Sequence, residues 1–241
     1  MFSRHRSVGR SGRVLVAAAC AVASLAGGLL PATAVRAAAS SSAPVTLQPR
    51  WVATPASQLP RIAIGRDPIA RGALVALAQL DQFRTTHDFV ALEKYTSQRD
   101  LLAAFVASRS GLSGSVVRAA WASADIRHQR VLLTALTQVG VPYRFATMRP
   151  GESFDCSGLT LWAWQHSGVT LARLAGQQIT SKSRIPAEKA VAGDLVYMPG
   201  HSLIYLGVKD LVLHAPYTGG LVRIDVLHLR DWYRFGNPLR G

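Results

Sequence analysis

The sequence predicts an α+β fold in which helices precede an antiparallel sheet along the chain. Apolar residues recur at helical spacing up to about residue 166, and after Gly193 they form short runs separated by turn residues. Helices followed by hairpin-linked strands are typical of helices packed on an antiparallel sheet. With 241 residues, 49% of them hydrophobic, the chain can bury a sizeable core, which excludes a disordered protein.

Residues 1–37 predict a secretory signal peptide. A basic opening without any acidic residue precedes an apolar run over 14–30, and small residues follow this run as cleavage sites. A retained membrane anchor is the alternative, but serine and glycine interrupt a run that is shorter than the ~20 apolar residues of a spanning helix. Lipidation at Cys20 is disfavoured because the apolar run continues beyond it. We therefore expect a secreted or cell-envelope protein without a stable membrane anchor.

Cleavage of this signal leaves Cys156 as the only cysteine of the exported protein. No internal disulfide can then form, so stability must come from the core. A lone thiol in an oxidising compartment is either buried and inert or retained for its reactivity. The residues around Cys156 indicate whether its thiol is inert or reactive.

Three segments follow the predicted signal peptide. Residues 38–61 are rich in serine, alanine and proline and lack an apolar period, which indicates a linker. Residues 62–125 have helical periodicity but no motif that carries chemistry, so we expect a small helical N-terminal region. Residues 126–241 contain the change from helices to strands, so we expect a second, α+β domain there.

Three helices are predicted in the helical N-terminal region. The first begins after Asp67 and Pro68, an N-cap followed by proline at the first helical position, and runs to about Phe83. The second is predicted from a capping box that starts at Ser97. The third follows from apolar residues at helical spacing over 117–124.

Two helices and four strands are predicted in the C-terminal segment. Apolar residues over 131–139 form a helix that Gly140 ends, and a second helix covers 156–166. If the chain has catalytic residues, we expect them where this second helix meets the sheet. The predicted strands cover 195–198, 202–206, 211–215 and 221–226.

Cys156 lies between Asp155 and Ser157, directly before an apolar helix. At this first turn the backbone N–H groups and the helix dipole favour the thiolate and lower the pKa of the thiol. A buried, inert cysteine is the alternative, although such a residue is more typical of an apolar run. The position favours a nucleophile whose own backbone N–H is a candidate oxyanion donor.

Two histidines can complete such a site. His201 opens one predicted strand and His214 ends the next, and antiparallel pairing brings the start of one strand beside the end of the other. A cysteine nucleophile needs an imidazole to take its proton, and that imidazole needs a polar partner to fix its tautomer. We therefore predict His201 as the base and His214 as its orienting partner. The histidines expected to have no part in catalysis are His5, His87, His128, His166 and His228.

Six short motifs over residues 131–226 follow one another in a specific order. They are Gly-Val-Pro-Tyr at 140–143, Asp-Cys-Ser-Gly-Leu at 155–159, Arg173 with Gln178, Gly-Asp-Leu-Val at 193–196, His201 with Ile-Tyr-Leu-Gly at 204–207, and His-Ala-Pro at 214–216. Each motif is weak alone, but this ordered set resembles the NlpC/P60 family of cell-wall peptidases, which are papain-like cysteine hydrolases of peptidoglycan.

The resemblance implies that residues 126–241 form a papain-like catalytic domain that needs no cofactor and no metal. The implied triad consists of Cys156 as nucleophile, His201 as base and His214 as the third, polar residue. The implied reaction is hydrolysis of a peptide bond in the peptidoglycan stem peptide through an acyl-enzyme, most often between D-glutamate and the diamino acid. The positions matched to substrate binding are Tyr143, Asp155, Ser157 and Arg173.

The chain also departs from the family pattern. Arg144, Phe145 and Ala146 stand where the family often has Trp-Gly-Gly, Ala172 replaces an expected proline, and Leu203 replaces a glycine two residues after His201. None of these changes removes a catalytic group. The bulk at Phe145 and Leu203 is expected to reshape the substrate groove.

Other classes of function remain as alternatives. The net charge of +14 fits nucleic acid, but the basic residues are scattered and export removes that partner, so anionic cell-wall polymers fit better. A catalytically inactive wall-binding module is a second alternative, against which the intact Cys156, His201 and His214 argue. A thiol acyltransferase or amidase on the same scaffold is the nearest enzymatic alternative, because the same nucleophile can pass its acyl group to another acceptor.

Overall fold

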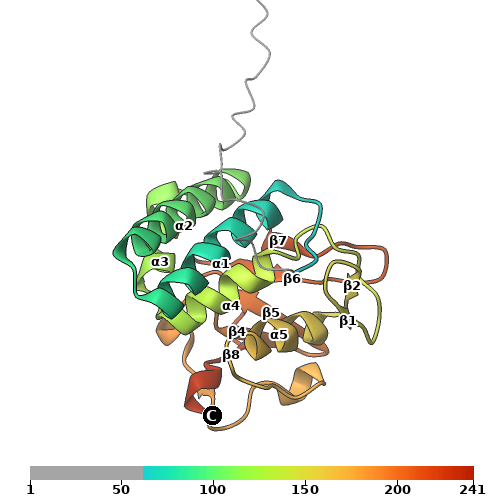
Figure 1. The fold of residues 1–241 in the computed structure, drawn as a ribbon. Coiled ribbons are helices and arrows are strands. Elements are labelled where there is room, and N and C mark those ends of the chain that lie inside the picture. The colour runs from blue at the N-terminus through green and yellow to red at the C-terminus, as the bar shows by residue number, and fades with distance from the viewer. Residues whose placement is uncertain (1–61) are drawn as a thin grey trace, which may run out of the picture. The chain divides into compact units, whose positions relative to one another are not determined.

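The computed structural model describes residues 62–241, which belong to one compact unit (Figure 1). The predicted signal peptide and the predicted linker lie outside these residues. The described part of the chain contains five α-helices and a six-stranded antiparallel sheet, which confirms the predicted α+β fold class. Within the same residues no helix is both long and apolar enough to cross a membrane.

The first helix, α1 (Pro68–Thr86), begins where the sequence predicts. Asp67 caps it by accepting the N–H of Ile69 at 2.9 Å, and Pro68 occupies the first helical position. Local side-chain chemistry is sufficient to define this helix start.

The second helix, α2 (Phe89–Arg109), begins earlier than predicted. Asp88 caps it, because its carboxylate accepts the N–H of Val90 at 2.9 Å. The predicted capping box at Ser97 is therefore wrong, since Ser97 lies inside the helix. Ala91 and Tyr95 extend the buried face in front of Ser97, and this tertiary burial outweighs the local capping pattern.

Three more helices follow, and the last of them begins at Cys156. α3 spans Gly114–Ser123, α4 spans Ile126–Leu136 and α5 spans Cys156–Gln165. Between α4 and α5 the chain forms a small hairpin of β1 (Met148–Arg149) and β2 (Ser153–Phe154). This hairpin delivers the chain to the start of α5.

The main sheet has the strand order β3-β8-β4-β5-β6-β7. Four of its strands coincide with predicted strands to within two residues at each end. β3, β8 and the small hairpin were not predicted, because strands of two or three residues are too short to reveal an alternating pattern. The strands span Arg184–Ile185 (β3), Leu195–Met198 (β4), His201–Tyr205 (β5), Leu211–His214 (β6), Arg223–Val226 (β7) and Arg234–Gly236 (β8).

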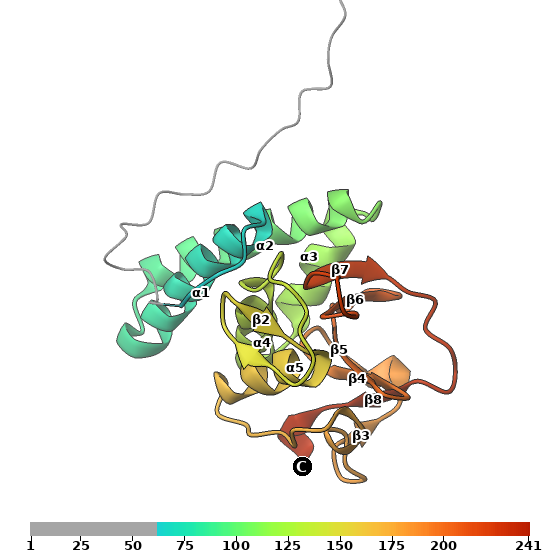
Figure 2. The same ribbon diagram turned by 90° about the vertical axis from the view of Figure 1, so that its right-hand side faces the viewer.

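The helices form successive layers on the sheet. α5 packs on β5 and β6, α4 packs on α5, and α1 packs on α4 (Figure 2). α2 packs on α1 and α3. One cluster of buried apolar residues runs through all these elements. Trp121 of α3 is fully buried, and its Nε1–H donates to the carbonyl of Leu206 at 3.0 Å. The predicted helical N-terminal region and the predicted catalytic domain therefore share one core.

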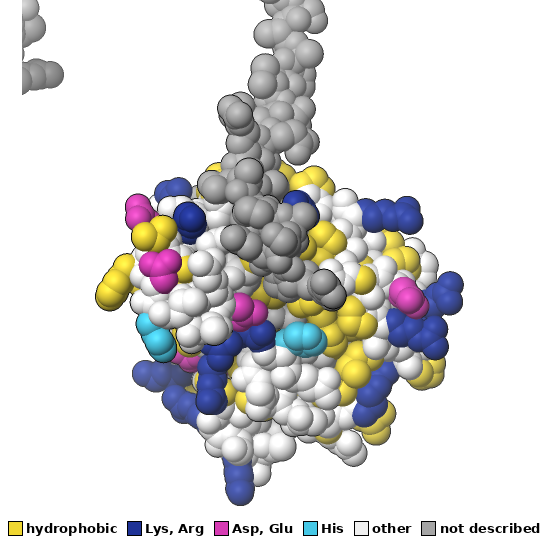
Figure 3. Space-filling model, in the orientation of Figure 1, with side chains coloured by type: hydrophobic (Ala, Val, Ile, Leu, Met, Phe, Trp, Pro, Cys, Tyr) yellow, Lys and Arg dark blue, Asp and Glu magenta, His cyan; other side chains and the backbone are white. Residues whose placement is uncertain are grey.

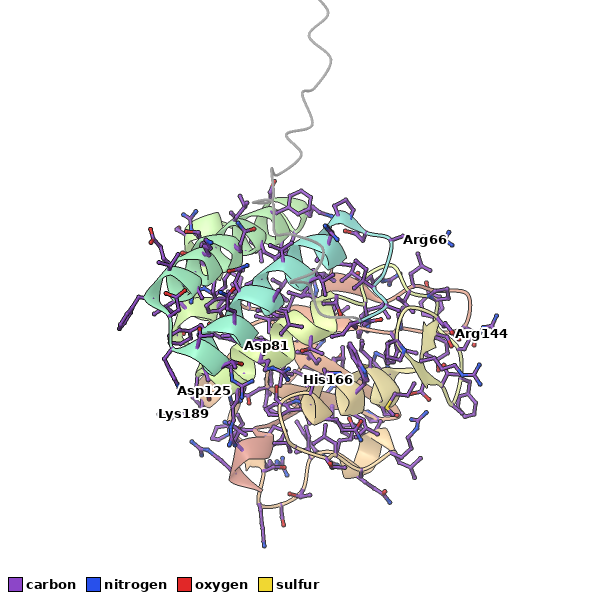
Figure 4. The ribbon with its side chains drawn as sticks, viewed as in Figure 1. Arg66, Asp81, Asp125, Arg144, His166 and Lys189 are labelled. Atoms are coloured by element: carbon purple, nitrogen blue, oxygen red, sulfur yellow. The ribbon has the colours of Figure 1, made fainter. Side chains whose placement is uncertain are left out.

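His128 of α4 ties this helix to the sheet. Its ring is fully buried, with Nε2 lying 2.9 Å from Oδ1 of Asp194, the residue before β4. The other ring nitrogen faces Asp125, the cap at the start of α4 (Figure 4). Gly193 allows this approach, because its φ is +102° and a Cβ there would lie 2.7 Å from the His128 carbonyl oxygen. His128 is thus a hydrogen-bonded core residue.

Replacing His128 with alanine is expected to lower the free energy of unfolding by about 3–5 kcal/mol, because the buried Asp194 carboxylate loses a partner. His228→Ala removes an exposed histidine and serves as the matched control, with a change within about 0.5 kcal/mol. Urea unfolding of the three proteins measures both values. Equal stabilities would contradict the bridging role of His128.

The contribution of His128 is also expected to depend on pH. Burial alone lowers the pKa of His128, but hydrogen bonds and charges from Asp194 and Asp125 outweigh burial and raise it above its ordinary value. The imidazolium then stabilises the fold fully below about pH 6.5, and this contribution is lost as the pH rises through the raised pKa. The stability difference between wild type and His128→Ala should therefore narrow above about pH 6.5. A difference that grew with pH would contradict this assignment.

Candidate active site

Cys156 is the first residue of α5, and the local sequence fixes it there. The Asp155 carboxylate caps the helix by accepting the N–H of Gly158 at 2.6 Å. A Cβ at Gly158 would lie 2.3 Å from the carbonyl oxygen of Thr147, so only glycine lets the preceding loop close over the helix start. The Cys156 side chain is buried but reaches the carbonyl of Gly200, with Sγ 3.9 Å from the oxygen.

The thiol of Cys156 is less acidic than the sequence suggests. Burial raises its pKa, and backbone N–H groups of Ser202, Ser157 and Cys156 oppose this effect without cancelling it. The expectation of a pKa lowered by the helix N-terminus is therefore wrong for the resting site, because desolvation outweighs the helix dipole. The thiol is protonated at neutral pH and needs a base.

The structure brings His201 and His214 together as predicted from the hairpin. His201 opens β5 and His214 closes β6, with Ile204 paired to Leu213 between them. Nε2 of His201 lies 2.8 Å from Nδ1 of His214. Burial and the charge of His214 lower the pKa of His201 to about 4, so this imidazole is neutral and can accept a proton.

Cys156 and His201 meet through the residues on either side of the histidine. The carbonyl of Gly200 contacts Sγ at 3.9 Å, and the backbone N–H of Ser202 is near enough to the thiol to lower its pKa. The start of β5 therefore runs directly past the thiol, and the histidine lies between these two contacts along the chain.

A carboxylate that the sequence did not single out continues this chain of contacts. Oδ2 of Asp225 in β7 lies 2.9 Å from Nε2 of His214 and accepts the Nε–H of Arg223 at 2.7 Å. Burial raises the pKa of Asp225, but hydrogen bonds from His214 and Arg223 lower it below its ordinary value. The signal that could have found Asp225 is a lone acidic residue in the predicted strand that pairs with the strand of His214.

A groove of about 410 Å³ opens over Cys156. Cavities of about 440 and 510 Å³ lie elsewhere, but Cys156 lines neither of them, so the thiol rather than the size identifies this groove. His201 and His214 are not among the residues that line it. The four residues predicted to bind substrate all line it: Tyr143, Asp155, Ser157 and Arg173.

Arg173 presents the accessible charge of the groove. Its guanidinium donates to both oxygens of Asp155, at 2.6 and 3.0 Å, and to Oγ of Ser157 at 2.9 Å. The Arg173 side chain is 40% exposed whereas that of Asp155 is 7% exposed. Asp155 therefore holds the arginine and caps α5, and Arg173 faces the groove.

Gln178 links the elements that carry the site. Its buried amide oxygen accepts the hydroxyls of Thr160 in α5 and Ser202 in β5, both at 2.6 Å. Its amide nitrogen donates to the carbonyls of Ser157 and Ala172, next to Arg173. One satisfied side chain thus fixes the helix of Cys156 against the strand of His201.

The rim of the groove is apolar where the chain departs from the family pattern. Phe145 is 82% exposed and Leu174 is 62% exposed, and both line the groove. Arg144, beside Phe145, points outward from its loop (Figure 4). Leu203, by contrast, is fully buried in the sheet and does not line the groove. Phe145 therefore lines the groove as expected, whereas the expectation that Leu203 reshapes the groove is wrong.

The described residues contain no group of three or more His, Cys, Asp or Glu side chains that could hold a metal ion. The other histidines of this part of the chain lie away from the groove. His166 directly follows α5, and its ring is hydrogen-bonded to the Trp162 carbonyl at 2.9 Å, at the end of the helix opposite to Cys156.

Comparisons with known proteins agree on one family. Residues 140–236 match the model described as NlpC/P60 family. A bifunctional muramidase/DL-endopeptidase, CwlT of Bacillus subtilis, is 36% identical over 88 residues, which are 33% of this chain and 27% of that protein. The peptidoglycan endopeptidase RipA of Mycolicibacterium smegmatis is 32% identical over 111 residues, 39% of this chain and 22% of RipA. The chain thus spans about a quarter of the length of these relatives.

The solved structures that are similar to this chain include NlpC/P60 proteins. An NlpC/P60 family protein from Bacillus cereus is 26% identical with a TM-score of 0.42, covering 46% of this chain and 40% of that one. RipD of Mycobacterium tuberculosis, described as a non-catalytic, peptidoglycan-binding NlpC/P60 protein, is 24% identical with a TM-score of 0.39, covering 47% of this chain and 98% of RipD. The match over residues 140–236 and the curated relatives together identify this chain as one that carries a domain of the NlpC/P60 family.

Proposed function

We propose that this chain is a cysteine endopeptidase that hydrolyses a peptide bond in the stem peptides of peptidoglycan. The observation that carries the proposal is the Cys156 thiol in contact with Gly200, the residue before His201, whose ring is hydrogen-bonded to His214. The relatives named as endopeptidases support the same reaction class. A DL-endopeptidase among them favours the bond between D-glutamate and the diamino acid.

The proposed reaction starts from a neutral thiol and a neutral imidazole. As Sγ of Cys156 attacks the substrate carbonyl carbon, His201 takes the thiol proton, and the backbone N–H of Cys156 is the candidate donor to the developing oxyanion. The His201 imidazolium then protonates the leaving amine as the peptide bond breaks. Water hydrolyses the acyl-enzyme, and the thiol regains its proton through the same imidazole.

The cell envelope is the proposed location. The predicted signal peptide would export the chain. Its cleavage removes five arginines and no acidic residue, so the net charge falls from +14 to +9, which still suits an envelope that contains anionic polymers. Basic side chains lie at several separate places on the face in Figure 3, unlike the continuous stripe of many nucleic-acid-binding proteins. This distribution favours diffuse attraction to the wall over recognition of nucleic acid.

Arg173 is proposed to bind the polar stem peptide. Arg173→Lys keeps the charge but cannot make the two-pronged contact with Asp155, so the cation should lose its fixed position. We expect KM for a stem-peptide substrate to rise about tenfold with kcat changed less than about threefold, the pattern of lost substrate binding. Arg184→Lys, at an exposed position in β3, is the matched control. A lower kcat with unchanged KM would contradict a binding role.

Mass spectrometry of digested peptidoglycan tests the proposed function as a whole. New stem fragments that end in D-glutamate support the endopeptidase. Free stem peptides released from the sugar indicate an amidase, and products joined to an added amine indicate an acyltransferase. Binding without any new product, equal to that of Cys156→Ala, indicates an inactive wall-binding module.

A further inference from the structure

Four side chains form a line that leads away from the groove. His201 of β5 contacts His214 of β6 at 2.8 Å, and His214 contacts Asp225 of β7 at 2.9 Å. Arg223 donates to the same oxygen of Asp225 at 2.7 Å. His214 is buried and His201 is half-buried, and the ring nitrogens that join them have their partners within the protein.

The hydrogen-bonding rules leave one arrangement of protons. An ionised carboxylate only accepts, so Nε2 of His214 must carry a proton and donate to Asp225. A neutral His214 then has an unprotonated Nδ1, which must accept from Nε2 of His201. A neutral His201 with a proton on Nε2 has a free lone pair on Nδ1. That nitrogen is the one that remains to take the thiol proton.

We propose that Asp225 is a positioning residue that fixes the tautomers of both histidines, so that His201 offers an unprotonated Nδ1 to Cys156. The role rests on the proposed cysteine peptidase and adds a residue outside its triad. Asp225 touches neither the groove nor the thiol, and acts through His214 alone. Arg223 supports it by keeping the carboxylate ionised.

Loss of the carboxylate removes the constraint on the proton positions. His214 can then carry its proton on Nδ1, which reverses its contact with His201 and makes Nε2 of His201 the acceptor. His201 would in that case hold its proton on Nδ1, the tautomer that cannot accept from the thiol. An asparagine at 225 retains an oxygen that can accept from His214, so it should hold the productive tautomer better than alanine.

Nitrogen NMR of the histidine rings tests the proposal without any substrate. In the wild type we expect protonated Nε2 and unprotonated Nδ1 on both His201 and His214, with the signals assigned by His201→Gln and His214→Asn. In Asp225→Ala the His214 ring should lose this single form, and in Asp225→Asn it should keep it in part. Unchanged ring signals in Asp225→Ala would overturn the proposal, as would a protonated Nδ1 on His214 of the wild type.

Turnover provides the second readout. Asp225→Ala should lower kcat on a stem peptide about 10–100-fold with little change in KM, and should lower it no further in a His214→Ala background. Asp231→Asn is the matched control, because it removes an exposed carboxylate that is not one of these four side chains, and it should match the wild type. Full loss from Asp225→Ala on top of His214→Ala would overturn action through His214. If the wild type cleaves no stem peptide but the ring tautomers are as expected, the proposed function fails and the positioning role stands.

Discussion

Cys156→Ala is expected to abolish peptide hydrolysis while leaving the fold intact. Removal of a catalytic nucleophile costs about 10⁴-fold or more in kcat, because no other group can form the acyl-enzyme. The contact that Sγ makes with the Gly200 carbonyl is long, at 3.9 Å, so its loss should change stability by no more than about 1 kcal/mol. Turnover of a stem-peptide substrate and thermal unfolding measure the two effects separately.

The other cysteine of the chain provides the matched control. Cys20→Ala in the full chain should leave hydrolysis unchanged, because Cys20 lies in the predicted signal peptide. A thiol alkylator should inactivate the wild type in step with modification of the peptide that contains Cys156. Undiminished hydrolysis by Cys156→Ala would contradict the cysteine mechanism.

The fold could be predicted wherever local signals, such as capping residues or an apolar pattern bounded by turns, define an element. α1 has a cap and a proline at its start, and β4 to β6 have an apolar pattern bounded by turn residues. The start of α2 was missed because burial of Tyr95 against other helices extends it past the local capping signal. β3 and β8 pair with each other across about fifty intervening residues. Strands of two or three residues are too short to show a pattern from which this pairing could be predicted.

The part of the site that lies on one hairpin could be predicted from the sequence. One turn separates the strands of His201 and His214, so their contact follows from antiparallel pairing. Asp225 requires the register of a further strand, which the sequence does not define. The direction of the pKa shift at Cys156 requires knowledge of burial, and the local pattern indicated only the helix dipole that opposes it. Packing between distant segments is therefore what the sequence alone left open.

The neutral resting state makes the base indispensable. A thiolate stabilised by the helix alone could attack without help, whereas a protonated thiol cannot. Since burial raises the pKa of Cys156 and lowers that of His201 to about 4, neither group is charged before substrate binds at neutral pH. Proton transfer from sulfur to imidazole then belongs to the attack itself, and the orientation of the ring determines its rate.

His201→Gln is accordingly expected to be as inactive as Cys156→Ala, and His214→Ala to lose up to about 10⁴-fold in kcat. His214→Asn should retain clearly more activity than His214→Gln, because the asparagine amide oxygen can occupy the place of Nδ1, the atom that contacts His201 at 2.8 Å, whereas glutamine reaches toward the Nε2 position. His228→Ala, at an exposed position, is the control that should match the wild type. Turnover of these variants on one stem peptide decides the matter: a His214→Ala enzyme as fast as the wild type, beside an inactive His201→Gln, would reduce the triad to a dyad of Cys156 and His201.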